Sequence, residues 1–297
     1  MGLNTVSAES QKLNSLIPTL LDQQARDLAQ NVEWWDILEP GHLHRTATYP
    51  VAHLGEGEPI LLLHGFDSSF LEFRRIAPLL SPQKKLLIPD LHGFGFSPRP
   101  SDGVYTPEAV LQHLEALLNK LPREPVGVIG ASMGGSVAVE LARRYPKRIH
   151  RLLLLAPAGL TGRPVPLPPV LNHLGVWFLS QPSVRRGLCR QAFANPDVSV
   201  GIPEEQLASL HLGITGWAAS LAAFARTGGF AGCGIPLPKQ RLHVIWGCQD
   251  RILRLPQKQA VMNLLGDVIE ELNPCGHLPH LDQPEAVARC WLEGADS

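Results

Sequence analysis

Short apolar runs alternate with segments of helical periodicity along two stretches of the chain. The runs predict buried strands at residues 59–63, 85–89, 126–129, 151–155, 242–246 and 267–272. Helical spacing predicts helices at residues 69–80, 107–121, 133–145 and 256–265, and a last helix from residue 284. Repeated strand–helix units of this kind predict the α/β class, with a mostly parallel sheet covered by helices on both faces.

The alternation stops between residues 157 and 240. Ten of the 27 prolines lie in this segment, together with long apolar stretches that lack the spacing of strands. We therefore predict a core formed by residues 47–156 and 241–297, with a helical cap inserted at 157–240. The first 46 residues are predicted to form a separate helical or extended segment.

Residues 9–30 have a pattern that fits two interpretations. Leucine and isoleucine recur mostly at helical spacing, and Pro18 interrupts the pattern. Such a segment either packs on its own domain or touches a membrane surface. Peripheral membrane contact is therefore one hypothesis for this protein.

Composition excludes several classes of protein. The 297 residues are 44% hydrophobic, and 26 basic and 27 acidic residues leave a net charge of −1 without long runs of like charge. This balance excludes extensive disorder and a nucleic-acid-binding surface. The five cysteines form no CxxC pair and lack zinc-ligand spacing, so we expect free thiols and no metal. Without an apolar run of membrane-spanning length or a signal-like start, we expect a cytoplasmic protein, with contact to an internal membrane as the alternative.

The sequence Gly130-Ala131-Ser132-Met133-Gly134 carries the main chemical signal. It follows a predicted buried strand and opens a predicted helix. A serine in such a turn has strained backbone angles, and its neighbours must be small because other backbone segments approach closely. The turn presents the hydroxyl at the carboxyl edge of the sheet, where ligands bind in open α/β folds. Ser132 is therefore the predicted nucleophile.

A serine needs a base to act as a nucleophile at neutral pH. Among twelve histidines, His277 is the strongest candidate, because it lies just after a predicted strand and so at the same edge of the sheet. His280 is the alternative, and we expect it to be structural or to line the pocket.

The base also needs an acid that orients it. Asp250 follows the predicted strand at 242–246 and completes the chain order serine, aspartate, histidine. Asp90 precedes the serine and fits that order badly. Asp282 is close to the histidine in sequence but is expected to cap the helix from residue 284.

Two backbone amides are predicted to hold the oxyanion that forms during acyl transfer. The amide of Met133 lies at the start of the helix after the serine. In His64-Gly65-Phe66, after the first strong strand, Gly65 allows the backbone to turn so that the amide of Phe66 faces the site. His64 is expected to be structural or to border the pocket.

These motifs together resemble the α/β-hydrolase superfamily, over roughly residues 47–295. The resemblance rests on the residues around 64–66, 89–97, 130–135, 246–251 and 276–280, which follow the family's order and spacing. It implies an enzyme with Ser132 as nucleophile, His277 as base, Asp250 as its partner, Phe66 and Met133 as oxyanion donors, and no cofactor. A serine nucleophile argues against the haloalkane dehalogenases and epoxide hydrolases, which use an aspartate.

A narrower resemblance concerns residues 65–74, Gly-Phe-Asp-Ser-Ser-Phe-Leu-Glu-Phe-Arg. This segment is similar to the corresponding loop of chlorophyll dephytylases, which cleave the phytyl ester of chlorophyll. The segment 157–240 offers an apolar surface that suits a long prenyl alcohol. The predicted pocket residues are His64, Trp177, Phe178, Trp217, Phe224, Leu278 and His280.

The predicted function is hydrolysis of a carboxylic ester with an apolar substrate, through an acyl-enzyme. One alternative is a carbon–carbon bond hydrolase or a cofactor-free perhydrolase of the same fold, since these families share the Ser-Met-Gly-Gly sequence at the serine. Another is a protein that binds its ligand and turns it over slowly. The sequence does not predict the oligomeric state.

Overall fold

An eight-stranded sheet organises the part of the chain that the structure describes. The computed structural model describes residues 7–294. The strand order is β1-β2-β4-β3-β5-β6-β7-β8, and only the pairs β1–β2 and β2–β4 are antiparallel. The strands are β1 (Val32–Leu38), β2 (Thr46–Leu54), β3 (Glu58–Leu63), β4 (Lys84–Pro89), β5 (Val126–Ala131), β6 (Ile149–Leu155), β7 (Arg241–Gly247) and β8 (Ile269–Leu272).

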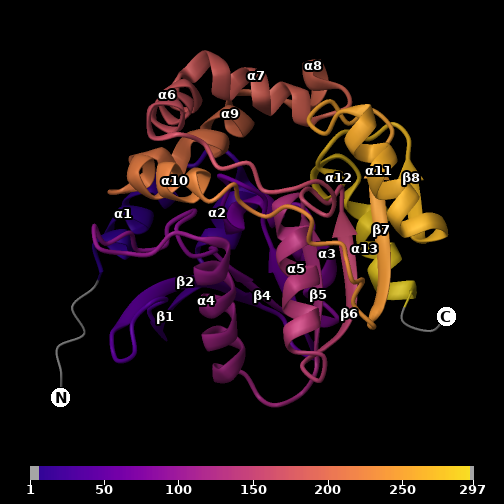
Figure 1. Cartoon of the computed structure of the whole chain (residues 1–297), viewed down its shortest axis with the longest axis horizontal. Helices are drawn as coiled ribbons and strands as arrows, with labels where there is room; N and C mark the ends of the chain where they lie inside the picture. The colour runs from indigo at the N-terminus through magenta and orange to yellow at the C-terminus, as the bar shows by residue number, and fades with distance from the viewer. Residues whose placement is uncertain (1–6, 295–297) are drawn as a thin grey trace.

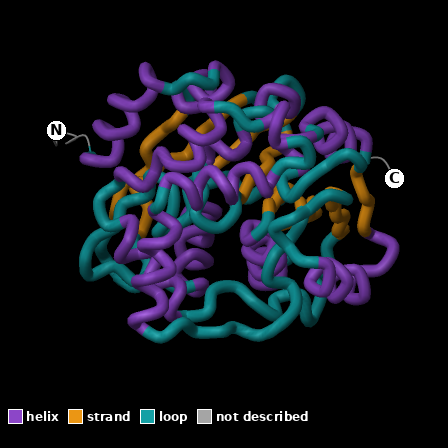
Figure 2. Tube along the Cα trace, turned by 90° about the horizontal axis from the view of Figure 1, so that it is seen from above, coloured by secondary structure: helices purple, strands orange, loops and turns teal. Residues whose placement is uncertain are grey.

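Helices cover both faces of this sheet, as predicted (Figures 1 and 2). Helices α4 (Pro107–Lys120), α5 (Met133–Arg144) and α11 (Leu255–Leu265) pack on one face. The opposite face is covered by α1 (Ala8–Leu16), α2 (Gln23–Ala29), η2 (Phe70–Phe73), α3 (Ala77–Leu80) and α13 (Pro284–Glu293). Successive residues of β3 alternate between the two cores, because side chains of a strand point to opposite faces.

The sheet begins earlier than residue 47, so the predicted boundary at residue 46 is wrong for the strands. β1 pairs along its whole length with β2. β1 is an edge strand of mixed polarity, with Glu33 and Asp36 among its residues, and lacks the apolar run that predicts a buried strand. Leu13, Leu20 and Leu28 are buried in the core, so the apolar face of residues 9–30 is used inside the protein.

The predicted helix at 69–80 is divided into two short helices, η2 and α3. The amide of Phe70 donates to Asp90, with a distance of 2.6 Å, and the carboxylate of Glu72 accepts from Gly65. Pro78, at the start of α3, has no N–H to continue a helix from before it. Both effects favour a break, and the break brings Glu72 behind the loop at Gly65.

The segment between β6 and β7 forms a group of helices, here called the helical insertion. It contains α6 (Pro169–Ser180), α7 (Pro182–Ala192), α8 (Pro196–Ser199), α9 (Ile202–Ser209), η3 (Leu210–Gly213) and α10 (Trp217–Arg226). These helices lie over one edge of the sheet, at the top of Figure 1. After the sheet resumes, η4 (Gly266–Val268) precedes β8, and α12 (Pro279–Asp282) precedes α13. Within residues 7–294, no single helix is long and apolar enough to span a membrane. The segments Ile202–Gly213 and Trp217–Arg226 reach that length and apolarity only when they are taken together, and they are bent relative to each other.

Close packing between α5 and β3 predicts a large effect of a single methyl group. A Cβ at Gly134 would lie 2.0 Å from the carbonyl oxygen of Leu63. We expect Gly134→Ala to lower the free energy of unfolding by at least about 2 kcal/mol. Gly175 in α6 has no atom within 4 Å of such a Cβ, so Gly175→Ala is the matched control and is expected to be neutral or stabilising. Urea unfolding measures both, and a Gly134→Ala variant as stable as the wild type would contradict this account of the turn.

Candidate active site

Ser132 occupies a strained turn between β5 and α5. Its backbone angles are φ 50° and ψ −117°, which a non-glycine residue adopts only when the surrounding structure imposes them. The Ser132 amide donates to the carbonyl of Leu155, with a distance of 2.9 Å. A Cβ at Gly130 would lie 2.3 Å from the carbonyl oxygen of Gly134. Small residues on both sides are therefore required for the turn to form.

Three predicted site residues meet at this turn. His277 Nε2 lies 3.0 Å from Ser132 Oγ, and His277 Nδ1 lies 2.9 Å from Asp250 Oδ2. The side chains of His277 and Asp250 are 6% and 1% exposed. The three residues thus form a continuous hydrogen-bonded chain from a shielded carboxylate to the serine hydroxyl, the arrangement that activates a serine for nucleophilic attack.

Asp250 is held by more groups than the sequence indicated. Trp246 Nε1 donates to Oδ2 at 3.0 Å, and the amides of Ile252 and Leu253 donate to Oδ1 at 2.9 and 3.0 Å. Burial alone would raise the pKa of Asp250, but the hydrogen bond and charge of His277 and the two amides hold that pKa below its ordinary value. The carboxylate is therefore charged at neutral pH and oriented toward His277.

The two other candidate acids, Asp90 and Asp282, do not bind the ring of His277. Asp90 accepts the amides of Phe70 and Phe96, both at 2.6 Å, and so supports the turn after β4. Asp282 accepts the amides of Ala194 and Gly276, and holds the loop before His277 rather than its ring.

The loop after β3 borders the serine. A Cβ at Gly65 would lie 3.4 Å from Ser132 Cβ, so the next residue, Phe66, is close to the turn. Within residues 7–294, the amides of Phe66 and Met133 donate to no other group, which leaves both available to an external oxygen.

His64 and His280 line neither cavity described below, because both side chains are fully buried, so of the two alternatives predicted for each, structural or pocket-lining, the pocket one is wrong. His64 Nε2 accepts the amide of Leu91 at 3.0 Å, and burial lowers the pKa of His64 to about 4, so it is neutral and supports the loop. His280 Nε2 lies 3.1 Å from a carboxylate oxygen of Glu72, behind the same loop.

Asp67 joins this loop to the helical insertion. Its carboxylate binds Arg185 of α7, His211 of η3 at 3.0 Å and Trp217 of α10 at 2.8 Å. Burial alone would raise the pKa of Asp67, but His211 and Arg185 lower it to about 2. The sequence gives no signal for this cluster, because its partners lie more than a hundred residues further along the chain.

Phe66 borders two cavities. The first, of about 320 Å³, is bordered by Ser132, His277 and Leu278 together with residues of α7 and α9. The second, of about 360 Å³, is lined entirely by apolar residues and glycines: Phe66, Met133, Ala158, Val165, Leu167, Phe224, Ala225, Gly228, Gly229 and Phe230. Leu278 and Phe224 thus line cavities as predicted.

The remaining predicted pocket residues lie away from both cavities. Trp217 is buried and bound to Asp67. Trp177 and Phe178 are exposed on the outer side of α6, which corrects their predicted place in the pocket. An apolar helix does not reveal from its sequence which face points inward.

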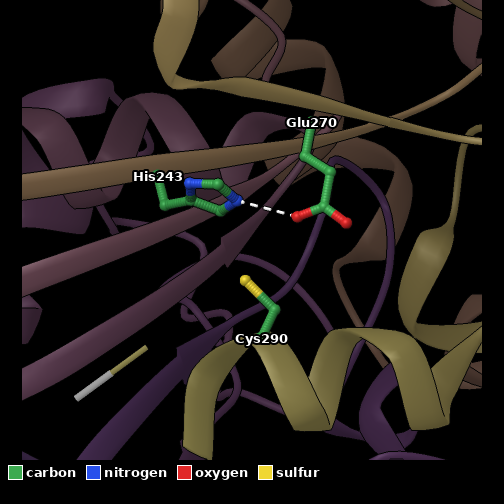
Figure 3. Close-up of side chains that lie close together, drawn as sticks. All are labelled: His243, Glu270 and Cys290. Atoms are coloured by element: carbon green, nitrogen blue, oxygen red, sulfur yellow. Dashed lines mark hydrogen bonds and ion pairs between the residues drawn. The ribbon is translucent and has the colours of Figure 1, made fainter. Parts of the chain in front are cut away.

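One group of side chains has metal-ligating chemistry. His243 of β7, Glu270 of β8 and Cys290 of α13 bring their donor atoms within 4.8 Å of one another, with 3.1 Å between the first two (Figure 3). They line a cavity of about 510 Å³ near the amino ends of β6 and β7. Three arginines line the same cavity: Arg151, Arg241 and Arg289. These cations oppose a divalent ion, and burial raises the pKa of the Cys290 thiol to about 11, which disfavours a thiolate. We assign no metal here.

Comparison with known proteins identifies the class. Residues 60–290 match the model of the "Alpha/beta hydrolase family". The chain belongs to this family and is a hydrolase enzyme.

Particular relatives agree with this family membership. An "Alpha/beta hydrolase domain-containing protein VTE7" of Arabidopsis thaliana is 28% identical over 284 residues, which are 92% of this chain and 86% of the relative. A 2-hydroxymuconate semialdehyde hydrolase of Pseudomonas putida is 28% identical over 252 residues, 79% of this chain and 86% of the relative. The structure of a 2-hydroxy-6-oxo-6-phenylhexa-2,4-dienoate hydrolase from Rhodococcus sp. has the same fold, with a TM-score of 0.73, 21% identity and coverage of 90% and 100% of the two chains.

The buried ion pair at Asp67 predicts a pH dependence of stability. Because the pKa of Asp67 is lowered on folding, its charge stabilises the folded state above about pH 4, and this contribution is lost as pH falls to about 2. Asp67→Asn leaves Arg185 buried without its partner, and we expect a loss of about 3 kcal/mol of unfolding free energy at pH 7. The difference from the wild type should shrink between about pH 5 and pH 2.

Denaturant unfolding at several pH values measures this difference. The control is Asp102→Asn, which removes an exposed partner of Arg45 and is expected to change stability little. A gap between wild type and Asp67→Asn that is equally large at pH 7 and at pH 2.5 would contradict the role given to the Asp67 charge.

Proposed function

We propose that the protein is a serine hydrolase that cleaves a carboxylic ester through an acyl-enzyme. The observation that carries this proposal is the hydrogen-bonded chain from Asp250 through His277 to Ser132, at the end of a strained turn. Arrangements of this kind activate an alcohol without a metal or an organic cofactor.

The geometry supports a definite course for the proton. With its Nδ1–H donated to Asp250, the neutral imidazole of His277 has its Nε2 lone pair directed at Ser132. Nε2 takes the hydroxyl proton as Oγ attacks the ester carbonyl, and the charged Asp250 stabilises the imidazolium that forms. The amides of Phe66 and Met133 hold the oxyanion. His277 then returns the proton to the leaving alcohol, and water repeats the sequence to release the acid.

The two cavities support an ester with two sizeable parts. The wholly apolar cavity at Met133 and Phe224 suits a long hydrocarbon chain, such as a prenyl alcohol. The cavity at His277 contains polar groups as well and suits the more polar part of the substrate. The phytyl ester of chlorophyll has this division, and the resemblance of residues 65–74 to chlorophyll dephytylases favours it as the first substrate to test.

The charges beside the serine favour an ester over a carbon–carbon substrate. The name of the Pseudomonas putida relative's substrate denotes an anion. In this chain the arginine that borders the cavity, Arg185, is bound to Asp67. Burial would raise the pKa of Glu72, in the same wall, but His280 holds that pKa below its ordinary value, so a second, buried carboxylate lies behind this wall. An anionic substrate would meet no positive excess, whereas a neutral ester is not repelled.

Removing the nucleophile tests the reaction. Ser132→Ala is expected to abolish labelling by a fluorophosphonate probe and to lower kcat for p-nitrophenyl esters by at least about 10⁴-fold. Ser136→Ala, four residues along α5, removes a hydroxyl bonded to Ala158 and should keep both activities. Labelling or hydrolysis that persists in Ser132→Ala would show that the proposed nucleophile is wrong. Stoichiometric ligand binding with negligible turnover by the wild type would favour the ligand-binding alternative.

The division of the substrate between the cavities is tested by filling each one. Leu167 and Leu188 are similarly exposed and border the apolar and the polar cavity, respectively. We expect Leu167→Trp to lower kcat/KM about tenfold for esters of long alcohols but little for methyl esters. Leu188→Trp should instead change kcat/KM by different factors for esters that differ in their acyl group.

A panel of esters graded by alcohol length, including chlorophyll and pheophytin, measures these effects, with a vinylogous diketone as the carbon–carbon substrate. If Leu167→Trp changes kcat/KM equally for esters of short and long alcohols, the assignment of a prenyl alcohol to the apolar cavity is wrong. Faster turnover of the diketone than of every ester would favour the carbon–carbon alternative.

A further inference from the structure

Helix α6 exposes an apolar face to the surroundings of the protein. Among its exposed residues, Trp177, Phe178 and Leu174 show 63%, 54% and 56% of their surface. Val170 and Leu171 are exposed beside them. The helix contains no aspartate, glutamate, lysine or arginine. Contiguous exposed apolar surface of this kind marks an interaction site in soluble proteins.

The inner face of α6 already has its packing partner. Asn172 donates to the carbonyl of Ala222 in α10, with a distance of 3.1 Å, and Val176 is buried in the core. The exposed face is therefore an additional apolar face. Helix α4 gives the contrast, because its exposed positions carry polar side chains: Glu108, Gln112, Asn119 and Lys120.

The apolar surface continues to the mouth of the apolar cavity. Val165 and Leu167, in the loop before α6, are exposed and also line that cavity. The Leu167 amide donates to the carbonyl of Ala225, so this loop lies along the end of α10. We call the exposed residues of this surface the α6 patch; they are Val165, Leu167, Val170, Leu171, Leu174, Trp177 and Phe178. Figure 1 shows α6 at the outer side of the helical insertion.

Positive charge accompanies the α6 patch. Three of the four arginines in residues 157–201 are paired with carboxylates, Arg185 with Asp67, Arg186 with Glu205 and Arg190 with Asp197, so they supply no free charge. Two exposed arginines lie beside the patch. Arg163 precedes it in sequence, and Arg226 follows Ala225, which binds the Leu167 amide. Neither forms an ion pair within the part of the chain that the structure describes. Cationic groups beside an apolar surface with tryptophan complement an anionic lipid headgroup layer.

We propose that the α6 patch docks on the surface of an anionic lipid bilayer. A protein seated on the patch would cover the mouth of the apolar cavity, whereas a fluid lipid surface leaves it open. The inference that the docked enzyme takes its substrate from the bilayer rests on the proposed ester hydrolysis; the docking itself does not. The helices at residues 8–29 are not part of the α6 patch, and their apolar face is turned into the core, where Leu13 and Leu28 are buried.

Vesicle co-sedimentation of the full chain tests the docking. The probes are vesicles of phosphatidylcholine alone and of phosphatidylcholine with an equal amount of phosphatidylglycerol. We expect the wild type to bind the anionic vesicles, and Trp177→Ser with Phe178→Ser to bind them at least tenfold more weakly. The matched control replaces two leucines outside the patch that are even more exposed, Leu43→Ser with Leu255→Ser, and should bind as the wild type does. Arg163→Gln with Arg226→Gln should weaken binding to anionic vesicles only.

Two further measurements separate the possible failures. Hydrolysis of a short, water-soluble ester should be the same in the Trp177/Phe178 variant and the wild type, which shows that the variant is folded. Ser132→Ala should bind vesicles like the wild type, so loss of catalysis and loss of docking are read independently.

Three results would overturn the proposal. They are a wild type that binds neither vesicle, a Trp177/Phe178 variant that binds as well as the wild type, and equal binding to both kinds of vesicle. In sedimentation velocity, a wild-type dimer that this variant dissociates, without vesicle binding, would assign the patch to a contact between copies of the chain.

Discussion

The close approach of α5 to β3 is the constraint on which the site depends. Gly134 lies so near the carbonyl of Leu63 that a methyl group has no room, and this packing holds Ser132 in a conformation that few residues adopt. A serine in a relaxed turn would not direct its hydroxyl toward His277. The strain at one residue is therefore maintained by the packing of the whole sheet, whose strands β3, β5 and β6 surround the turn.

The helical insertion is bound to this site through groups that also belong to it. The Asp67 carboxylate connects α7, η3 and α10 to the loop that carries the Phe66 amide, and the His277 amide donates to the carbonyl of Ala192 at the end of α7. The position of the insertion and the position of the reacting groups are thus coupled. A movement of the insertion large enough to admit a bulky substrate must either break these hydrogen bonds or move the bonded groups of the site with it.

Polarity is divided across the insertion in a way that fits an apolar substrate. Charged groups beside the serine are paired, as Arg185 with Asp67 and Glu72 with His280, whereas the cavity at Phe224 has no charged side chain. The α6 patch continues that apolar lining to the outside. One apolar surface therefore extends from the exterior of the protein to the residues proposed to hold the oxyanion.

The sequence by itself determined the sheet strands from β3 onward, the turn at Ser132 and the choice of His277 and Asp250, because buried strands have apolar runs and the carboxyl ends of parallel strands share one edge. It missed β1, an edge strand without an apolar run, and it also missed its neighbour β2. It placed Trp177 and Phe178 in the pocket. Only the tertiary structure decided the partners of Asp67 and the outward face of α6. Such contacts join residues distant along the chain, and a helix with apolar residues on both its inner and its outer side has no clear periodicity to distinguish the two faces.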